Sequence, residues 1–302
     1  MSHNLYTADA FADEMFKGNP AAVFLADAKS NHSERTLQTI AAEMNLSETA
    51  FPVPKDGTFA TAKNFGLRWL TPTTEVPLCG HATMATSHVL FNEIGNSNGT
   101  LTFHTLSGEL HCSKAEGGAI HMDLPQYQMK PTQEGAADME LPYEVVQEMK
   151  QTMESFGCVV EDAAYTPVGK FCLFRIATMP TDQFVRLPVK PPELLRSYKH
   201  AFTGSEALIG VIVTQKSANS KYDFQSRFFA PWVGVREDPA CGSAHCALSN
   251  YWCGQLNGQT EFKAYQCCPG RGASIGLKLD NATGRVRLTG QAVTVIRGSI
   301  DI

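Results

Sequence analysis

Residues 237–246 read EDPACGSAHC, and residues 75–84, in the first third of the chain, read EVPLCGHATM. Each stretch contains an acidic residue, a proline and then Cys-Gly, after which small residues begin a helix. An aromatic strand that carries an arginine and stops at a proline precedes each of them, RWLTP at residues 68–72 and RFFAP at residues 227–231. A β-rich segment follows each. This repeated order predicts two similar halves that face each other.

The length and composition fit two globular domains. A chain of 302 residues is long enough for two domains of roughly 100–150 residues each. Hydrophobic residues make up 43% and charged residues 18%, as in a well-packed protein. The polar stretch 126–140 is the best linker. We therefore expect an N-terminal lobe at 1–128 and a C-terminal lobe at 129–302, with the last strand, near 296–302, crossing back into the first lobe.

Several classes of protein are disfavoured by charge and cysteine usage. The net charge of −5 gives no basic surface for nucleic acid, and no Lys/Arg cluster is present to bind a membrane. The start, MSHN, lacks the features of a signal peptide. Nine cysteines, an odd number, without an export signal indicate reduced thiols and a cytoplasmic protein. No Cys-x-x-Cys occurs, so we expect no metal site.

The first Cys-Gly pair opens a helix that we expect at residues 80–93. The helix is apolar around most of its circumference, which suits a helix enclosed by sheet. Its first turn has unpaired N–H groups, Gly80 allows close approach of a ligand, and a helix N-terminus binds anions. The helix dipole should lower the pKa of His81 and leave a neutral imidazole. The alternative is that His81 only caps or packs.

The second Cys-Gly pair opens a similar helix, expected at residues 242–252. Asp238 lies just ahead of it and is either a cap or a carboxylate directed into a site. Ser243 either binds an anion or caps the helix. Because both copies present a helix start, we expect a small, negatively charged substrate to be bound between the two.

An acidic residue stands at the end of an amphipathic helix. Asn31 should cap this helix, with Glu34 three residues later, and the helix should end at Asn45. Glu48 then lies where the helix leads into a strand. Apolar surroundings would raise its pKa and suit it to general acid–base catalysis, whereas the alternative is an ordinary glutamate in solvent. Asn19 lies in a turn, where it either forms the turn or lines a pocket.

Four motifs carry a resemblance to a known family: GNPAAV at 18–23, NLSET at 45–49, CGHAT at 79–83 and EDPACGSA at 237–244. At these residues the chain resembles the PhzF-type isomerases, and in particular their animal members, the phenazine-biosynthesis-like domain-containing (MAWD-binding) proteins. The resemblance covers essentially the whole chain. It implies an α+β fold like that of diaminopimelate epimerase, with two pseudo-symmetric lobes, each a β-barrel around a central helix, and a site in the cleft between them.

The resemblance also implies an activity. The family's isomerase moves a proton on a small carboxylate-bearing molecule without a metal or cofactor. By this resemblance, Glu48 is the acid/base that moves the proton, and His81 and Asp238 assist it. The residues expected to bind substrate are Asn19, Ser47, Gly80, Gly242 and Ser243. A homodimer and a WD-repeat protein partner are further expectations from the family.

Two other readings remain open, the first of them because of one departure from the family pattern. The family usually has threonine where this chain has Cys241, so that, with Cys79, a cysteine stands at both helix starts. Two-base racemases and epimerases have this arrangement, and a thiol at a helix N-terminus has a depressed pKa. The alternative is that Cys241 fills a small buried niche. A third reading is a binding protein without enzymatic activity, for which the WD-repeat protein would be the partner.

Overall fold

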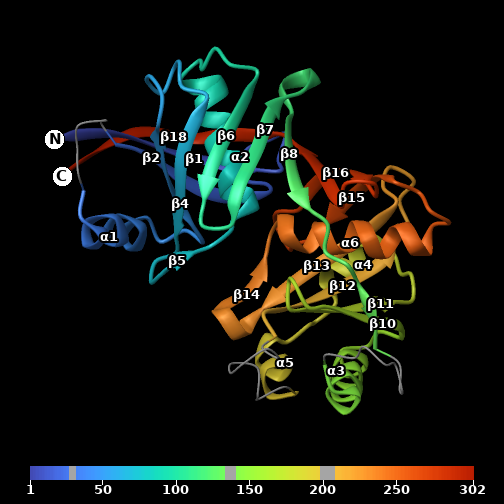
Figure 1. The fold of residues 1–302 in the computed structure, drawn as a ribbon. Coiled ribbons are helices and arrows are strands. Elements are labelled where there is room, and N and C mark those ends of the chain that lie inside the picture. Colours follow the sequence, from blue (N-terminus) through green and yellow to red (C-terminus); the bar gives the residue numbers. More distant parts are fainter. Residues whose placement is uncertain (27–31, 133–140, 198–207) are drawn as a thin grey trace. The chain divides into compact units, whose positions relative to one another are not determined.

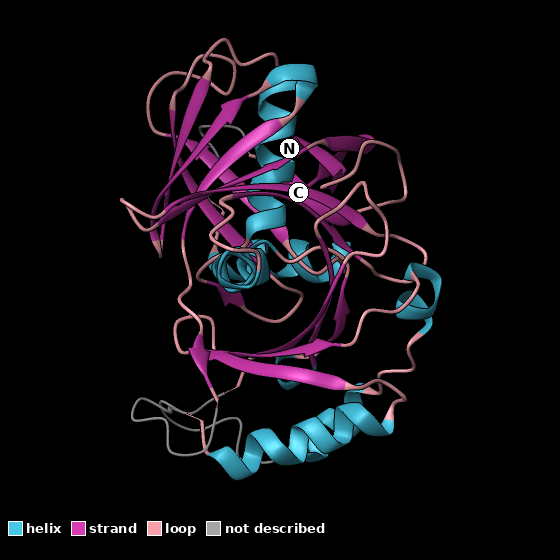
Figure 2. Ribbon diagram, turned by 90° about the vertical axis from the view of Figure 1, so that its right-hand side faces the viewer, coloured by secondary structure: helices cyan, strands magenta, loops and turns pink. Residues whose placement is uncertain are grey.

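A computed structural model describes residues 1–26, 32–132, 141–197 and 208–302. The chain forms two compact units: unit 1 contains residues 1–124 and 287–302, and unit 2 contains residues 125–286 (Figure 1). Both are mostly β-sheet with few helices (Figure 2), which confirms the α+β class. The first boundary falls at Leu124–Pro125, slightly before the expected position after residue 128. No helix in the described ranges is long and apolar enough to cross a membrane.

Unit 1 is a continuous series of paired strands. In order of pairing they run β18, β1, β2, β3, β4, β6, β7 and β8, and the short β5 pairs with β4. The pairs β2–β3 and β4–β6 are parallel and the others antiparallel. The strands are β1 (Ser2–Ala10), β2 (Asn19–Leu25), β3 (Thr49–Pro54), β4 (Asn64–Leu70), β5 (Glu75–Val76), β6 (Thr100–Thr105), β7 (Gly108–Lys114), β8 (Ile120–Pro125) and β18 (Ala292–Asp301). The helices are α1 (Glu34–Met44), α2 (Gly80–His88), the π-helical turn η1 (Val89–Glu93) and the 3-10 turn η2 (Glu116–Gly118).

Helix α2 lies in the core of unit 1, as its all-round apolar sequence predicts. It packs against β1, β2, β3 and β18 (Figure 1), and every residue from His81 to His88 is buried. Its polar side chains do not prevent burial, because the hydroxyl groups of Thr83, Thr86 and Ser87 each donate to the carbonyl four residues earlier, at 2.6, 2.7 and 2.9 Å. A buried hydroxyl that is hydrogen-bonded avoids most of the cost of desolvation.

Unit 2 repeats this arrangement with different residues. Its strands pair in the order β9, β10, β11, β12, β13, β15 and β16, and β14 pairs with β13. The strands are β9 (Lys130–Pro131), β10 (Val160–Thr166), β11 (Phe171–Ile176), β12 (Gly210–Lys216), β13 (Phe224–Ala230), β14 (Val235–Asp238), β15 (Glu261–Gln266) and β16 (Ala273–Asp280). Strand β17 (Arg285–Gly290) spans the second boundary, between residues 286 and 287, and pairs with β8. The helices are α3 (Tyr143–Ser155), α4 (Thr181–Arg186), α5 (Pro191–Ser197), the 3-10 turn η3 (Pro231–Val233) and α6 (Gly242–Gln255).

The two repeated motifs occupy equivalent places. In unit 1, β4 is antiparallel to β3 and parallel to β6, and β5 and α2 lie between β4 and β6 in the sequence. In unit 2, β13 is likewise antiparallel to β12 and parallel to β15, and β14 and α6 lie between β13 and β15 in the sequence. Arg68 binds Glu75 through two hydrogen bonds of 2.8 and 2.7 Å, and Arg227 binds Glu237 through two of 2.7 and 2.9 Å. Each arginine therefore ties its strand to the acidic residue that opens the motif, and the predicted repeat is confirmed.

The chain passes between the units twice. Strand β8 pairs with β7 in unit 1, and the following strand, β9, pairs with β10 in unit 2. At the other end, β18 follows β17 and pairs with β1 in unit 1. Thus β9, which pairs with β10 at the start of the second repeat, follows the last strands of the first repeat in the chain. Likewise β18, which pairs with β1 at the start of the first repeat, follows the last strands of the second repeat.

Two local expectations do not match the structure. The cap expected at Asn31 lies outside the described residues, and the N-cap of α1 is Ser33, whose Oγ accepts a hydrogen bond from the Thr36 N–H at 3.1 Å. Of the expected linker 126–140, residues 133–140 lie outside the described part. The described portion is ordered structure rather than an open linker, because β9 pairs with β10 and Tyr127 is buried.

Candidate active site

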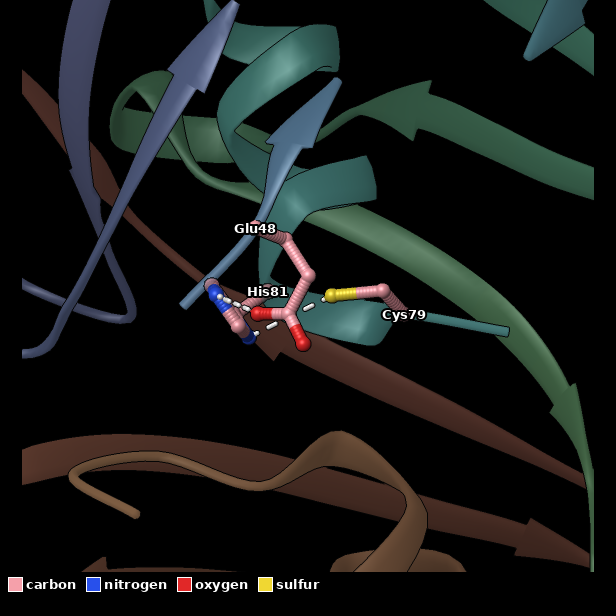
Figure 3. Close-up of side chains that lie close together, drawn as sticks. All are labelled: Glu48, Cys79 and His81. Atoms are coloured by element: carbon pink, nitrogen blue, oxygen red, sulfur yellow. Dashed lines mark hydrogen bonds and ion pairs between the residues drawn. The ribbon is translucent and has the colours of Figure 1, made fainter. Parts of the chain in front are cut away.

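The centre of the site in unit 1 is formed by Glu48, Cys79 and His81, whose side chains converge in Figure 3. His81 Nε2 lies 3.1 Å from Glu48 Oε2, and His81 Nδ1 lies 3.5 Å from Cys79 Sγ. The Ser47 hydroxyl is 3.2 Å from the same Nε2. Both ring nitrogens of His81 therefore have polar neighbours: Nε2 contacts Glu48 and Ser47, and Nδ1 contacts the Cys79 thiol.

Local structure fixes these side chains in place. The helix α1 ends at Asn45, which has a left-handed backbone (φ 49°), and the chain turns directly into β3. The Ala22 N–H of β2 donates to the Glu48 carbonyl at 3.2 Å and so holds Glu48 just before the start of β3. Cys79 is the extended N-cap of α2, and His81 lies in the first turn. The side chains of Glu48 and His81 are 16% and 6% exposed.

The pKa values of this pair shift in directions opposite to those the sequence predicted. Burial raises the pKa of Glu48, but the charge of His81, together with the polar groups of His81, Ser47 and Cys79 close to the carboxylate, outweighs burial and lowers it. Burial lowers the pKa of His81, but Cys79 and Glu48 outweigh it and raise that pKa well above its ordinary value. The expectations of a raised Glu48 pKa and a neutral His81 are therefore wrong. Direct contact between the two groups overrides both burial and the helix dipole.

The Glu48 carboxylate is ionised but incompletely paired. Glu48 Oε2 is fully covered by protein, and it has no hydrogen bond of normal geometry within the described residues. Its 3.1 Å contact with His81 is thus an ion pair by distance rather than a well-directed hydrogen bond. A buried carboxylate oxygen left in this state is costly in a folded protein, and such groups are enriched at functional sites.

The same three side chains include the ligand types that zinc prefers. One atom each from Glu48, Cys79 and His81 lie within 4.8 Å of one another. A thiol must ionise to bind a metal, and burial together with the charge of Glu48 raises the pKa of Cys79 to about 11. A metal ion bound here would therefore have to displace the proton of the Cys79 thiol.

The second Cys-Gly motif builds an equivalent helix start in unit 2. Cys241 is the N-cap of α6, and its Sγ lies 3.3 Å from the Ser243 hydroxyl, as Cys79 Sγ lies beside His81. His245 Nδ1 is 2.8 Å from the Cys241 carbonyl, which is the role of Thr83 in α2. Ser243 and Asp238 are both half-buried at this helix start.

Gln266 is a residue of this second helix start that sequence reasoning missed. Its Oε1 accepts from the Cys241 N–H at 2.9 Å, and its Nε2 donates to the Asp238 carbonyl at 2.5 Å. Only 1% of its surface is exposed. A glutamine at the end of a strand gives no signal in the sequence, because its partners are backbone groups of a distant loop.

The thiols of Cys79 and Cys241 are less acidic than the sequence suggested. Burial and the charge of Glu48 raise the pKa of Cys79, and burial and the charge of Asp238 raise that of Cys241 well above its ordinary value. The expected depression by the helix N-terminus is wrong, because the cost of placing a thiolate in a dry environment outweighs the helix dipole.

Asn19 begins β2, opposite Ala10 of β1, and is 1% exposed. The turn before it requires glycine: Gly18 has φ 58°, and a Cβ there would lie 2.1 Å from the Ala10 carbonyl oxygen. The expected site residues thus fall into two groups. Ser47, Glu48, Cys79 and His81 lie together in unit 1, and Asp238, Cys241 and Ser243 lie together in unit 2.

The fold and these sites define an α+β protein of two similar halves, each with a buried helix that starts at a Cys-Gly pair. The family described as phenazine biosynthesis-like protein matches residues 8–298, and the chain belongs to this family. It is 42% identical to the phenazine biosynthesis-like domain-containing protein of Homo sapiens, over 98% of each chain. It is 38% identical to an uncharacterized isomerase of Halalkalibacterium halodurans, over 99% of each chain. A PhzF-family phenazine biosynthesis protein of Enterococcus faecalis, solved by crystallography, has 34% identity and a TM-score of 0.79, over 100% of each chain.

Proposed function

We propose that this protein is an isomerase that moves a proton between carbon atoms of a small carboxylate-bearing substrate, with Glu48 as the acid/base. The observation that carries the proposal is the buried Glu48–His81 pair, in which the carboxylate is ionised and one of its oxygens lacks a directed hydrogen bond. Two relatives support the class: those of Halalkalibacterium halodurans and Pseudomonas aeruginosa, 38% and 36% identical, are described as uncharacterized isomerases.

The proposed reaction begins with the carboxylate form of Glu48. Glu48 removes a proton from a substrate carbon, and the electron pair of the broken C–H bond moves into the conjugated system. The neutral Glu48 then returns the proton to another carbon of that system, so that nothing is oxidised or reduced. The positive charge of His81 keeps Glu48 ionised before the first step. General acid–base catalysis of this kind contributes on the order of 10² to 10⁴ in rate.

The substrate carboxylate needs a separate binding site, which we assign to the start of α6. The first N–H groups of a helix have no intrahelical acceptor and carry a partial positive charge. At α6 these are the N–H groups of Gly242 and Ser243, beside the Ser243 hydroxyl. We assign proton relay to Asp238, whose backbone carbonyl accepts a hydrogen bond from Gln266 near this helix start. The scheme uses no cofactor.

Glu48→Gln tests the proposal. The protein is incubated in heavy water with a panel of unsaturated carboxylic acids that carry an acidic C–H bond, and proton exchange and isomer formation are followed by ¹H NMR. The wild type should exchange at least one of them, and Glu48→Gln should lower that rate by a hundredfold or more, since an amide cannot accept the proton. Glu43→Gln, at an exposed position of α1, is the matched control and should keep the wild-type rate. A fully active Glu48→Gln protein would sink the proposal.

The second candidate is a two-cysteine racemase, which the placement of Cys79 and Cys241 at two equivalent helix N-caps favours. The raised pKa values of both thiols oppose it. The two proposals differ in their response to Cys241→Ser. Loss of α-proton exchange from amino acids in heavy water in both Cys79→Ser and Cys241→Ser would favour the racemase. Retention of isomerase activity in Cys241→Ser would favour Glu48.

A further inference from the structure

Two histidines and a glutamate lie together on the outer face of the hairpin formed by the neighbouring strands β6 and β7 (Figure 1). His104 of β6 is the register partner of Glu109 of β7, and His111 is two residues further along β7. Successive side chains of a strand point to opposite faces, so these three share one face. Phe103 and Leu110, on the opposite face, are buried. The three outward residues are called the hairpin cluster.

The Glu109 carboxylate contacts both imidazoles of the hairpin cluster. His104 Nδ1 is 3.3 Å from Glu109 Oε1, and His111 Nε2 is 3.9 Å from Glu109 Oε2. Bonds from zinc to imidazole nitrogen and carboxylate oxygen are about 2.0–2.2 Å long, so two ligands of one tetrahedral ion lie about 3.3 Å apart. The first pair already has this separation. A small movement of the exposed His111 side chain toward His104 would bring the third ligand to the same ion.

A further contact holds the His111 ring from behind. Its Nδ1 lies 3.3 Å from the hydroxyl oxygen of Thr102, its register partner on β6. When Nδ1 donates to this oxygen, Nε2 keeps its lone pair on the side of Glu109. Histidines that bind metals have their other ring nitrogen held in this way, which fixes the tautomer. Asp123 of β8 is the register partner of His111 on the other side and adds a second carboxylate to this face.

The hairpin cluster suits a metal ion at neutral pH better than the Glu48–Cys79–His81 cluster does. It contains no thiol, so no thiol proton has to be displaced. Its side chains are between 30% and 55% exposed, and an ion can reach them from solvent. The side chains of Glu48 and His81 are only 16% and 6% exposed. The expectation of no metal site came from the spacing of the cysteines, which the hairpin cluster does not involve.

We propose that His104, Glu109 and His111 bind a divalent transition-metal ion of the zinc class. Two imidazoles and a carboxylate are ligands that zinc and its neighbours among the transition metals accept, and water would complete the coordination. The proposal is independent of the isomerase reaction. The ordinary alternative is a group of solvated surface side chains that only pair with one another.

The position of the hairpin cluster gives such an ion a structural task. The ion would join β6 to β7 beside the turn at 105–108, where the Ser107 hydroxyl donates to the Pro77 carbonyl at 2.8 Å. Pro77 lies two residues before Cys79, the N-cap of α2. A metal ion on the hairpin would therefore stiffen the support of this helix start without contact to the Glu48–His81 pair.

Zinc chloride, titrated by calorimetry into the whole protein after treatment with a chelator, tests the site. We expect the wild type to bind zinc at neutral pH. His104→Gln, His111→Gln and Glu109→Gln should each raise the Kd at least tenfold, because loss of even an outer-shell partner costs about 10–100-fold in metal affinity. His121→Gln is the matched control and should bind zinc as the wild type does, since His121 Nδ1 lies 2.8 Å from the Thr289 hydroxyl, outside the cluster.

Two further measurements separate this site from the core cluster and from effects on folding. Cys79→Ser should keep the wild-type zinc affinity. In ¹H–¹³C NMR spectra of the unmutated protein, zinc should shift the imidazole signals of His104 and His111 and leave that of His121 in place. A wild-type protein that binds no zinc would overturn the proposal. So would zinc affinity that survives the hairpin substitutions, or that is lost in Cys79→Ser, since the ion would then bind elsewhere.

Discussion

At the scale of single residues, His81 has the largest influence among the neighbours that keep Glu48 ionised. Burial alone would make this carboxyl group a weak acid, and His81 at 3.1 Å reverses that effect. The protein thus holds an ionised carboxylate at neutral pH, with the imidazolium of His81 as its counter-charge.

His81→Gln should therefore raise the pKa of Glu48. With the positive charge gone, desolvation becomes the dominant influence on the carboxyl group and favours its neutral form. A ¹³C NMR titration of the Glu48 carboxyl carbon measures this directly, without a substrate. His104→Gln removes a surface imidazole paired with Glu109 and should leave the titration unchanged. The same Glu48 pKa in wild type and His81→Gln would show that the pairing is not what controls it.

The pair also gives stability its own pH dependence. The lowered pKa of Glu48 contributes stability that is present above its ordinary value of 4.5 and is lost as pH falls through the folded pKa. The raised pKa of His81 contributes stability that is present below 6.5 and is lost as pH rises through its folded pKa. Urea unfolding should therefore show the largest gap between wild type and His81→Gln between pH 4.5 and 6.5. A gap that grows steadily above that range would contradict the assignment.

Sequence reasoning identified Glu48 and His81 as neighbours but not their charges. The motifs NLSET and CGHAT carried the resemblance from which both roles were inferred. The pKa directions were wrong because each residue was considered alone, against burial or the helix dipole, whereas the 3.1 Å contact appears only when the two segments are folded together. Gln266 was missed for a related reason, since its partners are backbone groups distant in the sequence.

At the scale of elements, the two central helices remain buried because their polar side chains bond within the helix. In α2, Thr83 bonds back to the Cys79 carbonyl, and in α6 His245 does the same to Cys241. The small residues and hydroxyls that look like weak helix formers in the sequence are therefore what permits sheet on several sides of the helix.

Thr83→Val should lower the free energy of unfolding by about 1 kcal/mol, since it removes one buried hydrogen bond while keeping the side-chain shape. Thr152→Val, on α3, removes a bond of the same kind to the Glu148 carbonyl, 2.9 Å long and open to solvent. That change should stay within about 0.5 kcal/mol of wild type. Urea unfolding compares the two. Equal losses at both positions would show that the hydroxyl of Thr83 is not important for burial of α2.

The existence and type of these elements could be predicted better than their limits. Both central helices start at the glycine that the sequence indicated, because the Cys-Gly step and the preceding proline mark the start clearly. The cap of α1 is Ser33, since several polar residues there could serve as a cap and only the fold selects one. The π-helical turn after α2 has no signal in the sequence.

At the scale of the whole molecule, the duplication is visible in the sequence. Most of the strand pairing that connects the units, in which β9 and β18 each follow the strands of the other unit, is not visible there. The repeat predicted two halves because the motif and its flanking strands recur in order. Which half each terminal strand joins depends on pairing partners hundreds of positions apart, as in Ser2 with Asp301. Only the final strand's return to the first lobe was expected, and the matching role of β9 in unit 2 was not.

Truncation after Gln291 should disrupt unit 1 selectively. It removes the strand that pairs with the whole length of β1 and the Thr294 hydroxyl that lies 2.9 Å from His88 Nε2. Hydrogen exchange followed by mass spectrometry should show lost protection in β1 and α2 and retained protection in α6. Removal of Ile302 alone is the control and should leave protection unchanged. Equal loss in α2 and α6 would show that the two units unfold as one.

The pairing of β18 with β1 also determines the order in which the two units can fold during synthesis. Strand β1 is translated well before its partner β18. Throughout synthesis, the first unit therefore exposes an open edge of the kind that recruits foreign strands. Unit 2 is one continuous segment of the chain and does not need a strand translated after it. The half that is translated later is therefore the first that can fold completely.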